Sequence, residues 1–94
     1  MALARVVTFE GVDAARMAEM AGEVEGGERP EGLPATEMML LHDEERGQAV
    51  AILFFDNEDD YRQGDELLNA MPAGDTPGRR TSVTKYAVAL RMNA

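Results

Sequence analysis

Apolar and polar residues follow two different periods along this chain, and glycine and proline separate the segments. Four segments are rich in β-branched, aromatic and other large apolar side chains: residues 4–9, 36–43, 48–55 and 81–92. Short apolar runs bounded by turn residues predict four strands, and the last, from Thr81 to Met92, is expected to be the longest. Residues 44–47, which end in Gly47, join the second and third strands and predict a β-hairpin.

Two stretches between these strands have the spacing of amphipathic helices. In the first, Asp13 is a suitable N-cap residue, and apolar side chains recur at helical spacing as far as Val24. In the second, Asn57 is the suitable N-cap, acidic residues follow it in the first turn, and Pro72 ends the pattern. Loops rich in glycine and proline are expected at residues 26–34 and 72–78.

The predicted order of elements is strand, helix, strand, strand, helix, strand. Right-handed crossovers in two such halves place both helices on one face of a four-stranded antiparallel sheet. We therefore expect a single α+β domain of the ferredoxin-like class over residues 1–94, with the first and third strands in the centre of the sheet.

Both faces of this sheet are expected to be apolar. In the third strand, one face receives Val50, Ile52 and Phe54, and the other receives Ala49, Ala51, Leu53 and Phe55. Two helices cover only one face, and large apolar patches are uncommon on the surfaces of soluble monomers. We therefore expect a symmetric homodimer, in which two sheets pack face to face and the long last strand reaches the partner.

Charge and composition narrow the classes of function. The 94 residues carry 9 basic and 18 acidic side chains and no cysteine. The acidic excess disfavours nucleic acid and anionic membranes as partners, and the lack of cysteine excludes disulfides, thiol nucleophiles and cysteine-ligated metals. No apolar stretch approaches the roughly 20 residues that cross a bilayer, and no signal-like segment is evident, so a cytoplasmic location is expected. All basic residues except Lys85 are Arg, which suggests a GC-rich bacterial genome.

Three segments carry a resemblance to a known family. They are residues 9–13 (Phe-Glu-Gly-Val-Asp) before the first helix, residues 54–61 (Phe-Phe-Asp-Asn-Glu-Asp-Asp-Tyr) at the start of the second, and residues 79–83 (Arg-Arg-Thr-Ser-Val) before a strand with Tyr86. With this layout the chain resembles the dimeric α/β-barrel superfamily, which includes the antibiotic-biosynthesis-monooxygenase-like domains. The resemblance implies a homodimer that binds or transforms small, often aromatic molecules between helices and sheet, in some members by cofactor-independent oxygenation or haem degradation. The chain has no Trp, which these enzymes often use, and whether it is an enzyme stays open.

Five residues are candidates for a site. His42 is the only histidine, and histidine is the usual side chain for proton transfer near neutral pH. It can act as an acid or base at a cavity mouth, or it can simply end a strand beside an acidic turn. Met17, Met38, Tyr61 and Tyr86 are the candidate ligand-binding residues, because methionine adapts to irregular apolar space and a tyrosine hydroxyl can orient a ligand. Ordinary core packing is the alternative for these four.

Two charged clusters also have alternative interpretations. Arg79 and Arg80 can hold an anionic ligand, or they can pair with acidic neighbours in this acid-rich chain. Residues 56–60 are mostly acidic but lack the ligand spacing and the glycine of a calcium loop, so helix capping explains them better. The sequence predicts neither a metal site nor a cofactor.

Two hypotheses about function follow. The first is a homodimeric α/β-barrel protein that binds or oxidises a small apolar or aromatic molecule, by cofactor-independent, monooxygenase-like chemistry if it is an enzyme, with His42 as acid or base. The second is a non-catalytic module of the ferredoxin-like class, which holds a regulatory ligand at the dimer interface or serves assembly alone. A packed interior would favour assembly, and a ring-sized pocket beside His42 or a tyrosine would favour the enzyme.

Overall fold

The structure, a computed structural model, describes residues 2–26, 32–70 and 78–93. Its elements follow the predicted order: β1 (Leu3–Glu10), α1 (Ala14–Glu25), β2 (Glu37–Asp43), β3 (Gln48–Phe55), α2 (Glu58–Asn69) and β4 (Arg79–Ala87). Neighbouring strands are antiparallel in the order β2-β3-β1-β4, so β1 and β3 are central, as predicted. The α+β class is confirmed, and the arrangement is compatible with a ferredoxin-like fold. Most of the two predicted loops lies outside the described residues.

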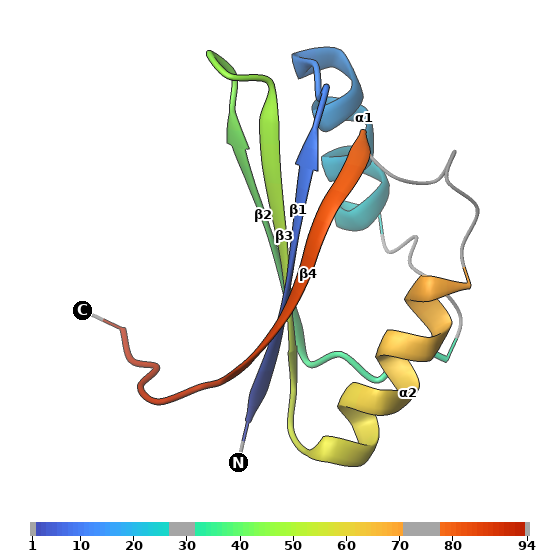
Figure 1. Cartoon of the computed structure of the whole chain (residues 1–94), viewed down its shortest axis with the longest axis vertical. Helices are drawn as coiled ribbons and strands as arrows, with labels where there is room; N and C mark the ends of the chain where they lie inside the picture. The colour runs from blue at the N-terminus through green and yellow to red at the C-terminus, as the bar shows by residue number, and fades with distance from the viewer. Residues whose placement is uncertain (1, 27–31, 71–77, 94) are drawn as a thin grey trace.

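The sheet has two unlike sides. Both helices lie on one side, which we call the helix face, and the opposite side is the open face (Figure 1). On β1, the helix-face side chains are all buried: Leu3, Arg5, Val7 and Phe9. The register carries this division across the sheet, because Val7 pairs with Ala51 of β3 and with Val83 of β4, and paired residues share a face. No helix in the described part of the chain is long and apolar enough to cross a membrane.

The helix face holds two clusters of buried apolar side chains. The first cluster contains Val7, Phe9, Val12, Met17, Ala49 and Ala51, with Leu40 packed against it. The second cluster contains Leu3, Leu53, Phe55 and Tyr61, with Leu33, Ala35, Met38 and Leu68 packed against it. On β1, Arg5 lies between the residues that belong to the two clusters.

The second cluster depends on a glycine in α2. Phe55 is fully buried, and its ring meets the ring of Tyr61 edge-on, with the centroids 5.5 Å apart. A Cβ atom on Gly64 would lie 2.4 Å from Cε1 of Phe55, closer than real side chains approach one another. Gly64 therefore lets α2 pack directly against the ring of Phe55.

Side-chain caps start both helices, as the sequence predicts. Asp13 Oδ1 accepts the backbone N–H of Arg16 at 2.7 Å, and Asn57 Oδ1 accepts that of Asp60 at 2.8 Å. The predicted apolar stripe of α1 is only partly used, because Met17 is the one buried residue among the described side chains of this helix. α1 is therefore held more by its start than by a continuous apolar face.

The predicted hairpin between β2 and β3 is confirmed. Gly47 has a φ of 65°, in the left-handed region that favours glycine. Its carbonyl oxygen accepts the backbone N–H of Val12 at 2.8 Å. The hairpin turn is thereby tied to the segment that leads into α1.

The expectation that the last strand extends to Met92 is wrong. Ala87 pairs with Leu3, the first residue of β1, and the next contact is the N–H of Val88 to the carbonyl of Ala2 at 3.0 Å. β4 therefore ends level with the start of β1, its one neighbour in the sheet. Residues 88–93 then bend away from the helices towards the open face (Figure 1).

Candidate functional site

His42, the candidate acid or base, lies near the end of β2 on the helix face and is half-buried. Its Nε2 lies 3.4 Å from the carbonyl oxygen of Val12, a long contact that joins β2 to the start of α1. Within the described residues, His42 therefore contacts a backbone oxygen and no carboxylate. A carboxylate partner is what would orient the ring for proton transfer.

The candidate ligand-binding residues lie in three different places. Met17 belongs to the first apolar cluster, whereas Met38 and Tyr61 belong to the second. Tyr86 pairs with Ala4 and therefore points to the open face, where its side chain is 54% exposed. The structure thus packs Met38 against the cluster that contains Tyr61 and places Tyr86 on the opposite side of the sheet from the helices.

Tyr61 is enclosed on several sides. Its ring packs against Phe55, and the ammonium group of Lys85 lies over it at 5.0 Å from the centroid. Burial raises the pKa of the Tyr61 hydroxyl, the Asp65 carboxylate raises it further, and Arg5 and Lys85 oppose these effects. Tyr61 is therefore protonated at neutral pH and acts as a packing residue with a neutral hydroxyl group.

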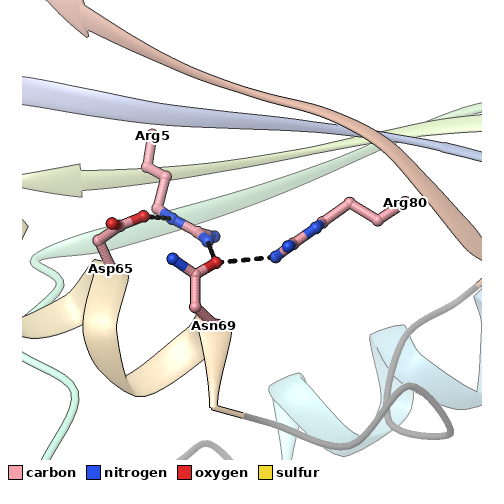
Figure 2. A network of polar contacts seen from close by, with 4 residues as sticks. All are labelled: Arg5, Asp65, Asn69 and Arg80. Carbon is pink, nitrogen blue, oxygen red and sulfur yellow. Dashed lines mark hydrogen bonds and ion pairs between the residues drawn. The ribbon is translucent and has the colours of Figure 1, made fainter.

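A polar network that sequence reasoning missed lies between the sheet and α2 (Figure 2). The side chain of Arg5 is 3% exposed, and its Nε donates to Asp65 Oδ1 at 2.8 Å. Its NH2 group donates to Asn69 Oδ1 at 3.0 Å, and NH1 of Arg80 donates to the same oxygen at 2.9 Å. Three elements, β1, α2 and β4, thus meet at one amide oxygen.

The chain does contain a signal for this network. Arg5 occupies a helix-face position between Leu3 and Val7, so a charged residue falls on the apolar phase of a central strand. A buried charge needs a partner, and α2 offers Asp65 and Asn69 four residues apart, on one face of the helix. A guanidinium group stays protonated in folded proteins, so the network can bind an anion but cannot exchange protons near neutral pH.

Arg79 and Arg80 do not form one basic cluster. Arg79 reaches Glu10 on β1, with NH2 2.5 Å from Oε2, and so pairs with an acid, as one of the two interpretations expected. Arg80 reaches Asn69 instead, from the next position of the edge strand. The described contact of Arg80 is with a neutral side chain. Of the two arginines, Arg80 is therefore the one that can hold an anion.

The acidic run at residues 56–60 is used in the start of α2. Asn57 caps the helix, Glu58 pairs with Lys85, and Asp59 lies 3.6 Å from Arg62. No group of three or more potential metal ligands was found among the described residues. Capping and surface ion pairs therefore account for the run.

The open face is apolar in its centre and charged only near its ends. Its exposed large side chains include Met39 at 42%, Leu41 at 47% and Tyr86 at 54%, and the half-buried Val50, Ile52 and Phe54 lie among them. At one end of the strands Glu10 pairs with Arg79, and at the other Glu37 pairs with Arg91, whose guanidinium carbon also lies 4.2 Å from the centroid of the Phe54 ring. The centre of this face has no charged side chain among the described residues.

Comparisons with models of protein families, with curated proteins and with solved structures find no match. The functional argument therefore rests on the fold and on the contacts described above.

Proposed function

We propose that this protein is a homodimeric assembly module whose two copies join through the open faces of their sheets. One observation carries the proposal: the open face presents large apolar side chains, Met39, Leu41 and Tyr86, that the chain itself leaves 42 to 54% exposed. Covering such a patch removes apolar surface from water, which is the main driving force of protein association.

The charge pattern supports a second copy as the partner. The chain has a formal net charge of −9, so two copies repel one another over most of their surfaces. The open face avoids this repulsion, because its centre is uncharged and the acids at its ends, Glu10, Glu37 and Asp43, are each paired with an arginine of the same chain. Two identical open faces can meet about a two-fold axis, and the result is a dimeric α/β barrel.

The contacts on the helix face favour assembly over oxidation of a ligand. Met17 and Met38, which were candidates for a flexible ligand cavity, belong to two separate apolar clusters. His42 contacts a backbone carbonyl, and the Tyr61 ring is packed against Phe55. These residues act in packing, which supports the non-catalytic alternative.

Analytical ultracentrifugation of a charge substitution on each face tests the proposal. The wild-type chain is expected to sediment as a dimer at micromolar concentration. Leu41→Asp places a charge in the interface and is expected to weaken association by about a hundredfold or more, since burying an unpaired charge costs several kcal/mol. Leu41 is 47% exposed in the single chain, so the variant is expected to fold.

Val83→Asp is the matched control. Val83 is also a partly exposed apolar residue, at 36%, but it pairs with Val7 and so belongs to the helix face. This variant is expected to dimerise as the wild type does. A monomeric wild-type chain at micromolar concentration, or equal loss of association in both variants, would contradict the proposed interface.

A further inference from the structure

Two guanidinium groups converge on one uncharged oxygen beneath the sheet. Arg5 and Arg80 both donate to Asn69 Oδ1, at 3.0 and 2.9 Å, from two neighbouring strands (Figure 2). Like charges that share one acceptor repel one another, and an amide oxygen neutralises neither. Guanidinium groups usually pair with anions. Arg5 has Asp65 as such a partner, whereas Arg80 has none among its described contacts.

A count of charges over the described residues leads to the same conclusion. On the helix face, Arg5, Arg80 and Lys85 carry three positive charges, while Asp65 pairs with Arg5 and Glu58 pairs with Lys85. The carbonyl groups at the end of α2, near Asn69, offset about half of the remaining charge. A net positive charge thus remains at Arg80, in a chain whose total charge is −9.

We propose that Arg5, Asn69 and Arg80, the convergent arginine site, bind the carboxylate group of a small organic acid, with the exposed Arg80 making the contact and the buried Arg5 holding Asn69 in place. A planar carboxylate matches the planar donor fork of a guanidinium group. Asp65 lies beside the site and disfavours anions of higher charge, such as phosphate, because it repels each additional negative charge. The site holds one buried charged side chain, Arg5, so its geometry is fixed by the fold before any ligand arrives.

The surroundings of Arg80 favour an acid with an apolar body. Leu3, Val7 and Leu53, which share the helix face with Arg5, are buried in the chain's own packing and offer a ligand no surface. Val83 lies on the helix face of β4, as Arg80 does, and is 36% exposed, so an aromatic or branched acid covers more apolar surface there than acetate does. The proposal does not depend on the dimer, because the site lies on the helix face and the proposed interface lies on the open face.

Titration with sodium benzoate, at an ionic strength held constant with sodium chloride, tests the site. Isothermal titration calorimetry is expected to give saturable binding of benzoate, weaker binding of acetate, and no saturable binding of inorganic phosphate. Arg80→Gln is expected to weaken benzoate binding about tenfold, because a charge-assisted hydrogen bond is lost. Asn69→Asp, which supplies a carboxylate from the chain itself, is expected to weaken it to a similar extent.

Arg79→Gln is the matched control, since it removes the same charge from the adjacent residue, which pairs with Glu10 instead. Its benzoate affinity is expected to stay within about twofold of wild type, because exposed charges contribute little at moderate salt. Failure of benzoate to saturate, equal losses in Arg79→Gln and Arg80→Gln, or tighter binding of phosphate than of benzoate would each overturn the proposal. Sedimentation of the same samples reports the dimer separately, so loss of one function does not imply loss of the other.

Discussion

Phe54 and Phe55 are adjacent in β3 and point to opposite faces of the sheet, in very different surroundings. Phe55, on the helix face, is fully buried against Tyr61 and Gly64 of α2. Phe54, on the open face, is half-buried, with only the side chain of Arg91 described over its ring. The same residue type thus contributes to the stability of one chain on one face and, by our proposal, to contact between two chains on the other.

The largest expected effect is that of Phe55→Ala. Removing a fully buried phenylalanine leaves a cavity beside Tyr61, and such substitutions cost about 3–5 kcal/mol of unfolding free energy. Urea unfolding monitored by circular dichroism measures this loss. A loss no larger than that of Phe54→Ala would show that the two faces do not differ in the way described.

Gly64→Ala is expected to have the next largest effect, about 3 kcal/mol, because the added methyl group forces the Phe55 ring and α2 apart. Gly22→Ala is the control, since a Cβ atom at Gly22, in α1, meets nothing within 4 Å. There alanine is expected to raise stability by about 0.5–1 kcal/mol through its higher helix propensity. A shift of the urea midpoint in the same direction for both variants would contradict the close packing of α2 on Phe55.

The elements that sequence reasoning predicted well are those set by local patterns. The caps at Asp13 and Asn57, the hairpin at Gly47 and the central position of β1 and β3 follow from nearby residues and from the order of elements. The predicted end of β4 was wrong because the length of a strand in a sheet depends on the strand that it pairs with. For β4 that strand is β1, which lies far away in the chain.

The candidate site was harder to predict for the same reason. Tyr86 points to the open face because β4 pairs with β1 in a register that places it opposite Ala4, and a shift of that register between Thr8 and Phe9 places Arg80 on the helix face, opposite Phe9. The partners of Arg5 lie 60 and 64 residues away, and Arg80 joins them only when β4 pairs with β1. The alternation of residues in β1 shows that Arg5 is a charged residue at an apolar position. Only the packing of α2 against the sheet shows which side chains pair with it.

Breaking the pair of Arg5 and Asp65 is expected to cost about 2 kcal/mol, because Asp65→Ala leaves a buried guanidinium group with a neutral partner. The loss is smaller than for a fully buried pair, since Asp65 is 34% exposed and water can reach the site. Glu66→Ala, at the adjacent and exposed position, is expected to change stability by less than about 0.5 kcal/mol. Equal effects of the two substitutions in urea unfolding would mean that the network adds no stability.

Phe54→Ala sharpens the comparison from the open side. Its effect on the folding of a single chain is expected to be about 1 kcal/mol, because Phe54 is only half-buried there. A dimer contact adds a concentration-dependent part, since association stabilises the folded state by mass action. Unfolding measured at two protein concentrations separates the parts, and a loss that does not depend on concentration would argue against an interface at Phe54.

The two tyrosines extend the comparison to alkaline pH, where the smallest effect is expected. Burial raises the pKa of Tyr61 above its ordinary value of 10.0, so the unfolded chain loses this proton at a lower pH than the folded chain does. The contribution to stability is complete below about pH 10 and is lost as the pH rises through the folded pKa, with a slope for one proton of at most about 1.4 kcal/mol per pH unit. Tyr61→Phe is expected to remove this part of the slope of unfolding free energy against pH. Tyr86→Phe, on the open face, is the control and is expected to retain it. Because Tyr61 is then the one tyrosine left in the chain, its titration can be followed by ultraviolet absorbance in the Tyr86→Phe variant. If wild type and Tyr61→Phe lose stability equally above pH 10, the enclosure of Tyr61 by the helix face does not reach its hydroxyl group.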